Sequence, residues 1–71
     1  MNKTTAQKRL EAANLRVLAA SQRSNAAAHR RQAEHPIYPG QDMVCLGKAD
    51  QIDAFAARSE AQADLIESEI A

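Results

Sequence analysis

The ten residues EHPIYPGQDM, Glu34 to Met43, divide a chain of 71 residues into two segments of helix-forming composition. Pro36 disfavours helical geometry at His35, so a helix that precedes it must end there. In residues 38–41, Tyr-Pro-Gly-Gln, proline and glycine occupy the second and third places of a type II turn, and the third place requires a positive φ. This stretch therefore predicts a tight reversal of the chain centred near Tyr38.

Both segments that flank the turn are predicted to be helical. Residues 5–34 lack proline and glycine and are rich in Ala, Arg, Gln, Leu and Glu. Thr4 and Gln7 have the spacing of a capping box at the start of this helix. The second helix is expected over about residues 43–70 with Asp42 as its N-cap, although Gly47 is an alternative start and residues 43–46 also fit an extended piece. The sequence thus predicts an all-α, antiparallel helical hairpin that forms a single domain over residues 1–71.

Apolar and small residues recur in both helices at alternating steps of four and three, which is the spacing of heptads. The stripe expected in the first helix comprises Ala6, Leu10, Ala13, Val17, Ala20, Ser24 and Ala27. The stripe expected in the second comprises Cys45, Ala49, Ile52, Ala56, Ser59, Ala63, Ile66 and Ile70. Facing positions such as Leu10 and Ile66 have residue numbers that add to 76, so the hairpin should reverse at half that value, Tyr38. The heptad register and the turn chemistry agree on the point of reversal.

The two halves of the chain carry opposite charge, although the formal net charge is zero. Residues 1–35 contain seven Lys or Arg and two Glu, whereas residues 36–71 contain two Lys or Arg and seven Asp or Glu. Charges recur every seven residues at Arg9, Arg16, Arg23 and Arg30 and at Asp53, Glu60 and Glu67. With the expected stripes at heptad positions a and d, the arginines fall at g and the acids at e, on opposite sides of an antiparallel seam. We therefore expect them to meet across a subunit boundary or to form solvated helix edges.

The composition of the chain predicts self-association. Sixteen residues are alanine, which buries little surface, so a monomer of this size should be marginally stable. A second apolar face contains Ala12, Leu15, Leu18, Ala19, Ala26, Phe55, Ala61 and Leu65. We expect a four-helix bundle or larger helical oligomer with Leu15, Leu18, Phe55 and Leu65 at its interface. The alternative is that Leu15 and Leu18 are scattered surface residues.

No catalytic, cofactor or metal motif is present, so we expect a non-enzymatic protein. The only cysteine, Cys45, falls in the apolar stripe, which favours an inert buried thiol over a nucleophile. His29 and His35 are six residues apart and lie on different helical faces, which does not suit a zinc site. Since the sequence shows neither a signal peptide nor a membrane-spanning run, and the cysteine has no partner, a cytoplasmic location is expected.

The turn and the basic edge beside it are the candidate binding site for another macromolecule. Tyr, Met and Arg are enriched in interface cores and among hot-spot residues. The candidate partner-binding residues are Ile37, Tyr38, Met43, Arg23, Arg30 and Arg31. The alternative is that the turn side chains fold back and close the end of the bundle.

A nucleotide-like anion is the alternative ligand, held near the turn between subunits. Guanidinium groups and a stacking ring suit phosphates and bases. The candidate anion-binding residues are His29, Arg30, Arg31, His35 and Lys48, although Glu34 and Asp42 lie in the same region. Duplex DNA or RNA is disfavoured because the acidic half repels phosphate.

The sequence as a whole favours a small self-associating protein that binds another macromolecule. The favoured partner is a protein, and inhibition of that partner is one form that the function could take. Small alanine-rich helical chains of this kind are common among accessory proteins of phages and mobile elements, including inhibitors of host systems. That comparison rests on composition and size.

Overall fold

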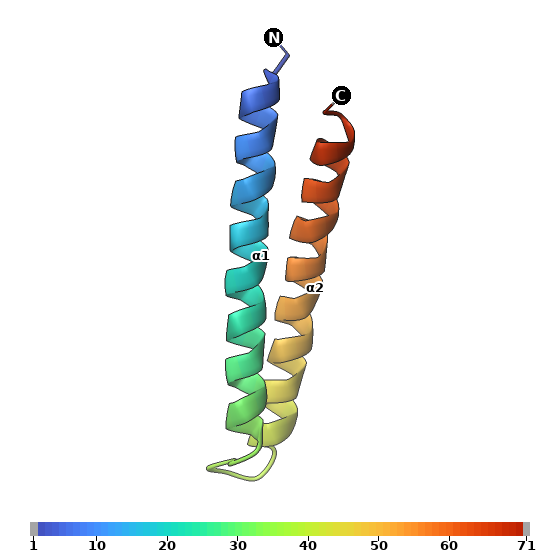
Figure 1. Ribbon diagram of the computed structural model, residues 1–71. Helices are drawn as coiled ribbons and strands as arrows, with labels where there is room; N and C mark the ends of the chain where they lie inside the picture. Colours follow the sequence, from blue (N-terminus) through green and yellow to red (C-terminus); the bar gives the residue numbers. More distant parts are fainter. Residues whose placement is uncertain (1, 71) are drawn as a thin grey trace.

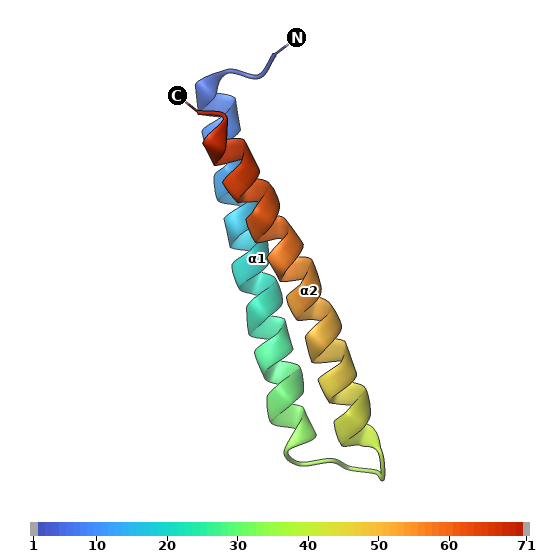
Figure 2. The same cartoon turned by 90° about the vertical axis from the view of Figure 1, so that its right-hand side faces the viewer.

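The computed structural model describes residues 2–70 and contains two long helices, α1 (Thr5–Ala33) and α2 (Gln41–Ser68), which pack side by side in opposite directions (Figure 1). The Cα trace forms a rod of 53 × 18 × 13 Å. The start of α1 and the end of α2 lie at one end of the rod, here called the open end, and the connecting loop forms the other end, the tip (Figure 2). The predicted all-α helical hairpin is confirmed.

α1 begins at the predicted capping box. The side-chain oxygen of Thr4 accepts a hydrogen bond from the backbone N–H of Gln7 at 3.1 Å, and Gln7 Oε1 accepts one from the backbone N–H of Thr4 at 2.8 Å. Both bonds satisfy N–H groups that the first turn of a helix leaves without an intrahelical partner. The helix ends at Ala33, three residues before Pro36, as the proline predicted.

The reversal of the chain is a type II turn over residues 38–41. Gly40 has φ +89° and ψ −8°, the conformation expected at the third place of this turn, and the Gln41 N–H donates to the Tyr38 carbonyl at 3.2 Å. A second hydrogen bond, from the Ile37 N–H to the side-chain oxygen of Gln41, ties the loop to the start of α2. The predicted turn chemistry is confirmed. Two hydrogen bonds hold the tip, one between backbone groups and one from a backbone N–H to the Gln41 side chain.

The predicted start of α2 is wrong by at least two residues. The helix begins at Gln41, with Gly40 as N-cap in place of Asp42, and residues 43–46 and Gly47 are all helical. The turn explains the early start, because the Gly40 carbonyl already accepts the N–H of Val44 at 3.3 Å and thereby closes the first helical turn. Asp42 then lies in the first turn of α2, where its negative charge suits the helix dipole.

The core between the helices consists of small side chains. Among the described residues, no buried apolar side chain is larger than cysteine. The buried residues are Ala12, Ala19 and Ala26 of α1 and Cys45, Ala49, Ala56, Ser59 and Ala63 of α2. Residue numbers in the pairs Ala12/Ala63, Ala19/Ala56 and Ala26/Ala49 all add to 75, within one residue of the expected register. Alanine against alanine lets the two helices approach closely.

The seam expected on α2 is confirmed, whereas the seam expected on α1 is wrong. Leu10 and Val17, which were expected to face α2, are 63% and 70% exposed. The buried face instead runs through Ala12 and Ala19, two positions further along, so α1 is rotated by about 200° relative to expectation at ~100° per residue. Of the face expected at contacts between subunits, Ala12, Ala19 and Ala26 of α1 therefore lie inside the hairpin, whereas Leu18, Phe55, Ala61 and Leu65 are exposed.

Candidate functional site

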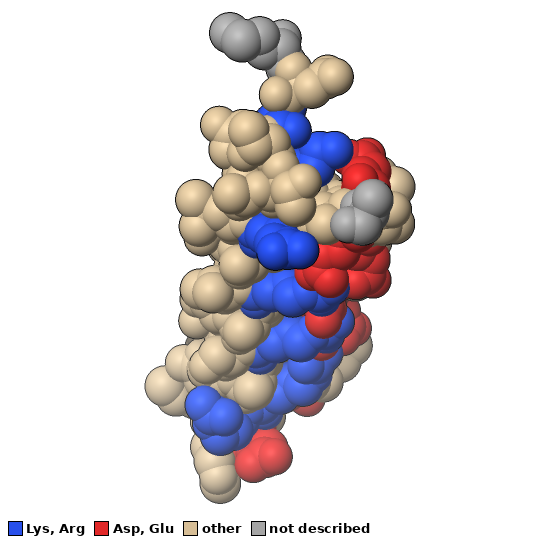
Figure 3. All heavy atoms as spheres, turned by 45° about the horizontal axis from the view of Figure 1, so that its top comes forward, with Lys and Arg blue, Asp and Glu red and all other residues tan. Residues whose placement is uncertain are grey.

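One edge of the hairpin carries a row of ion pairs between the basic face of α1 and the acidic face of α2. Arg16 donates to Glu67 Oε1 from Nε at 2.8 Å and to Asp64 Oδ1 from Nη2 at 2.7 Å. Figure 3 shows the row as a column of basic side chains beside a column of acidic ones, with uncharged side chains over the neighbouring part of α1. We call this side the ion-paired edge.

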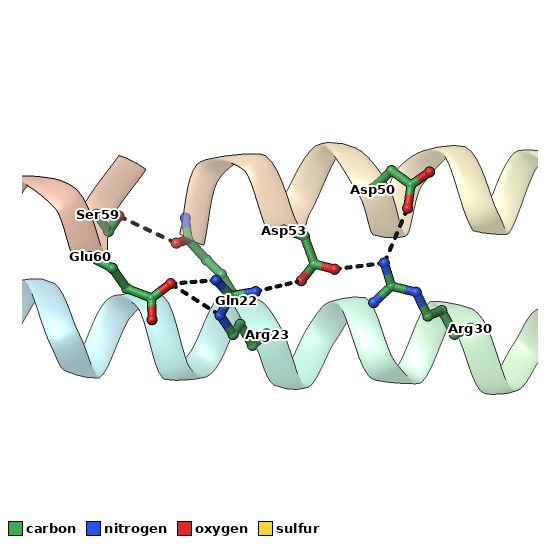
Figure 4. Close-up of polar contacts among 7 residues, drawn as sticks. All are labelled: Gln22, Arg23, Arg30, Asp50, Asp53, Ser59 and Glu60. Carbon is green, nitrogen blue, oxygen red and sulfur yellow. Dashed lines mark hydrogen bonds and ion pairs between the residues drawn. The ribbon is translucent and has the colours of Figure 1, made fainter. Parts of the chain in front are cut away.

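The same arrangement continues toward the tip in steps of seven residues along α1. Arg23 Nε lies 3.1 Å from Glu60 Oε1, and Arg23 Nη1 lies 3.4 Å from Asp53 Oδ1. Arg30 Nη2 lies 2.6 Å from Asp53 Oδ2 and 3.1 Å from Asp50 Oδ1. Asp53 therefore joins two arginines through its two oxygens, so that the contacts form a connected network (Figure 4).

The basic and acidic stripes were expected on opposite sides of the seam, and these contacts within one hairpin contradict that placement, although the paired side chains remain partly exposed. The corrected face of α1 explains the difference. With Ala12, Ala19 and Ala26 at heptad position a, the paired arginines fall at e rather than g, and antiparallel neighbours pair e with e. The sequence also missed Asp50 and Asp64, which lie three residues before Asp53 and Glu67 and so share their helix face.

Arg16, Arg23 and Arg30 are committed to partners within the hairpin. Hydrogen bonds to Glu67 and then Asp64 raise the pKa of Arg16 above its usual range, and a hydrogen bond to Glu60 does the same for the pKa of Arg23. Hydrogen bonds to Asp53 and Asp50 raise the pKa of Arg30. Because arginine is already charged at neutral pH, these shifts leave its charge unchanged. Since the side chains are also partly exposed, each pair adds little stability, but together they favour one rotation of α1.

The opposite edge of the hairpin carries apolar side chains at mid-height, with Arg58 beside them. We call it the apolar edge and define it by Leu15, Leu18, Ile52 and Phe55, which occupy d and g positions in the corrected register. Leu15 and Ile52 are half-buried, whereas Leu18 and Phe55 are 48% and 45% exposed.

A shallow groove adjoins this edge near the open end of the hairpin. It has a volume of about 480 Å³ and is lined by Lys3, Gln7, Leu10, Glu11, Asn14, Leu15 and Leu18. On α2, the Arg58 guanidinium lies 5.5 Å from the ring centre of Phe55 and covers one face of it. Leu65, the fourth residue expected at an oligomer interface, is 62% exposed.

The tip presents its large side chains to solvent. Ile37 is 85% exposed, Met43 71% and Tyr38 52%, and Val44 and Leu46 on the next turn of α2 are also exposed. Within the single hairpin, therefore, these side chains do not fold back over its end. The turn hydrogen bonds described above hold the backbone that carries them.

The basic residues considered for an anion site do not form one cluster. Arg30 is bound to Asp50 and Asp53, and His29 is half-buried at the seam. Arg31, His35 and Lys48 are exposed, but Arg31 falls at the outward f position of α1 and Lys48 at position g of α2. The two aspartates beside Arg30 oppose the binding of an anion at this point.

Three further features bear on the kinds of site that the described residues can form. Within residues 2–70, His, Cys, Asp and Glu side chains nowhere gather in threes that could hold a metal ion. Neither helix in that range has a stretch both long enough and apolar enough to cross a bilayer. Cys45 is buried, and its sulfur lies 3.9 Å from Gln32 Oε1.

Comparison of the chain with protein-family models, with curated protein sequences and with solved structures finds no match. Function is therefore inferred from the surfaces of the hairpin alone.

Proposed function

We propose that the protein is a small, non-enzymatic interaction protein that self-associates into a helical bundle and binds another protein through the tip of the hairpin. The observation that supports the second part is the exposure of Ile37, Tyr38 and Met43 on one short turn. Exposed apolar side chains gathered at one place commonly mark interaction sites, whereas scattered ones need no explanation.

The geometry of the tip suits protein recognition. The backbone is held by the type II turn and by the bond from Ile37 to Gln41, so little conformational entropy is lost when a partner orders the loop. Tyr38 and Met43 are residue types that interface cores favour. Arg31 is exposed nearby and can donate to a partner, while Arg23 and Arg30 already have partners in the hairpin.

The experiment compares binding by the wild type, by a tip variant and by a matched control. The tip variant is Tyr38→Ala with Met43→Ala, and the control is Val17→Ala, because Val17 is as exposed as Met43 but lies far from the tip. Proteins captured on the immobilised wild type are identified, and the affinity of the purified partner is then measured for all three forms. We expect the tip variant to bind at least about tenfold more weakly, since two interface side chains are truncated, and the control to bind as the wild type does.

Equal affinity of the tip variant and the wild type, with unchanged helicity in both, would remove the tip from the proposal. The nucleotide-like anion is less well supported, because Arg30 is bound to two aspartates. Failure of any nucleotide at millimolar concentration to raise the melting temperature would exclude it.

A further inference from the structure

The surface area of the hairpin exceeds the area expected for a compact monomer of the same mass. The described hairpin exposes 5190 Å². A compact monomer of 7.7 kDa is expected to expose about 4,300 Å². The excess, roughly 900 Å², is close to the ~800 Å² per partner that a standard interface buries. The elongated shape, 53 × 18 × 13 Å, accounts for an area larger than that of a compact chain, and the excess is large enough for one contact of the size used by stable dimers.

The apolar edge is the surface best suited to that contact. The ion-paired edge already satisfies its charges within the hairpin, whereas Leu18 and Phe55 face solvent on the other side of the seam. Both residues lie within one residue of the midpoints of their helices, Thr5–Ala33 and Gln41–Ser68. A two-fold axis through this mid-height point brings the same side chains of two copies together, as an isologous interface requires.

We propose that a second copy of this chain packs on the apolar edge with its tip at the open end of the first, about a two-fold axis beside Leu18 and Phe55. The proposal rests on the self-association proposed above and specifies its interface and its orientation. The occupant is a second copy because the charges that flank this edge, Glu11 and Lys48, complement those of another copy.

The charges that flank the apolar edge select the antiparallel orientation. Glu11 lies seven residues before Leu18 and Lys48 seven residues before Phe55. Because the helices run in opposite directions, Glu11 lies toward the open end and Lys48 toward the tip, each about 10 Å from mid-height at ~1.5 Å per residue. In the antiparallel dimer, Glu11 of each copy is level with Lys48 of the other, so the two-fold axis gives two such pairs. Two copies with their tips at the same end would place Glu11 level with Glu11 and Lys48 level with Lys48, which is unfavourable.

Other charged groups lie near the edge, including Arg58, whose guanidinium covers one face of Phe55. Lys8 and Glu69 lie 3.7 Å apart and pair within one hairpin at the open end. Lys3 contacts Glu11 through Oε2, which leaves Oε1 available to a second cation.

The interface is tested by the molar mass in light scattering and by the dissociation constant of the dimer in sedimentation equilibrium. We expect the wild type to reach twice 7.7 kDa at micromolar concentration. Leu18→Glu with Phe55→Glu should raise the dissociation constant at least about 100-fold, because four large apolar contacts are lost per dimer. Val17→Glu, which changes the neighbouring residue on the outer face, should leave it unchanged. Circular dichroism checks that each variant remains helical, as their exposed positions predict.

The orientation is tested by exchanging the flanking charges. Glu11→Lys alone and Lys48→Glu alone should each weaken the dimer by about three- to tenfold, and the double exchange should restore the wild-type constant. If the double exchange is no better than the single changes, the antiparallel orientation is wrong.

The remaining outcomes separate this proposal from the function on which it rests. A monomeric wild type at 100 μM would overturn self-association and the dimer together. A wild-type dimer that persists in the Leu18→Glu, Phe55→Glu variant would overturn this interface and leave self-association in place. Binding of a partner protein to the tip is measured independently by the Tyr38 and Met43 variant, so its failure leaves the dimer untouched.

Discussion

Arg23 of α1 and Glu60 of α2 are 37 residues apart in the chain, yet Arg23 Nε lies 3.1 Å from Glu60 Oε1. Equivalent contacts join Arg16 to Glu67 one heptad toward the open end and Arg30 to Asp53 one heptad toward the tip. The repeat means that one rotation of α1 about its axis satisfies all three arginines at once. Rotation in either direction would break all of them together.

Reversing the charge of Arg23 should destabilise the hairpin in a salt-dependent way. In Arg23→Glu, the new carboxylate faces Asp53 and Glu60, so the melting temperature should fall in low salt. The fall should shrink on going from 0.1 to 1 M NaCl, since the screening length drops from about 10 Å to about 3 Å. Arg23→Glu combined with Glu60→Arg should recover part of the loss. Thermal unfolding followed by circular dichroism at the two salt concentrations measures the effect.

Arg58→Glu is the control for this experiment, because Arg58 is an exposed arginine in the middle of α2 that forms no ion pair with residues 2–70. It should change the melting temperature less than Arg23→Glu does. The raised pKa of Arg16, Arg23 and Arg30 also fixes the direction of any pH effect. A raised pKa in the folded state gives stability that is fully present below the ordinary arginine pKa and is lost only as pH rises past the folded value. These arginines should therefore add no pH dependence between pH 7 and 10, and a salt-sensitive loss in that interval would contradict the assignment.

Enlarging a seam alanine should destabilise the hairpin far more than enlarging its neighbour. Ala19 is 3% exposed and lies level with the fully buried Ala56, so Ala19→Leu forces the helices apart at a cost of about 1–3 kcal/mol. Ala20 is exposed, so Ala20→Leu should change stability by less than about 0.5 kcal/mol. Urea denaturation of both variants measures the difference. The reverse order, with Ala20→Leu the more damaging, would support the face that contains Leu10 and Val17 instead.

The two glycines should respond to alanine with opposite signs. Gly40 has φ +89°, so Gly40→Ala places a Cβ in the left-handed region and should cost about 1–2 kcal/mol. Gly47 lies inside α2 with no atom within 4 Å of an added Cβ, so Gly47→Ala should stabilise by about 0.5–1 kcal/mol through higher helix propensity. Urea unfolding of the two variants tests both at once. Loss of stability in Gly47→Ala would contradict the placement of this residue inside a helix.

Removing the N-cap of α1 should have a local effect. Thr4→Ala loses the bond to the Gln7 N–H and should cost about 0.5–2 kcal/mol. Amide exchange at Gln7 should accelerate in this variant, while exchange at residues in the middle of α1 should follow the global change only. Thr5→Ala, at the first helical position next to it, serves as the control and should leave the exchange at Gln7 slow. Equal protection of Gln7 in Thr4→Ala and the wild type would show that the cap contributes nothing.

The sequence by itself determined the turn, the lengths of the helices and the buried face of α2. Pro36, Pro39 and Gly40 restrict the backbone locally, so the reversal of the chain needs no tertiary contact to specify it. On α2 one heptad stripe, from Cys45 to Ile70, clearly surpasses the others in small and apolar residues. The start of α2 was displaced only because the turn glycine doubles as its N-cap.

Only the tertiary structure decided which face of α1 is buried, and with it the role of the arginines. α1 has two stripes of nearly equal periodicity, one with Leu10 and Val17 and one with Ala12 and Ala19. Periodicity cannot rank them, and the larger side chains of the first suggest the core when the helix is considered alone. Because α2 presents an alanine seam flanked by carboxylates, the alanine face of α1 packs against it. This packing permits close approach and places the arginines beside the acids. Close packing and the ion pairs both arise only between the two helices, so neither can be inferred from the sequence of α1 by itself.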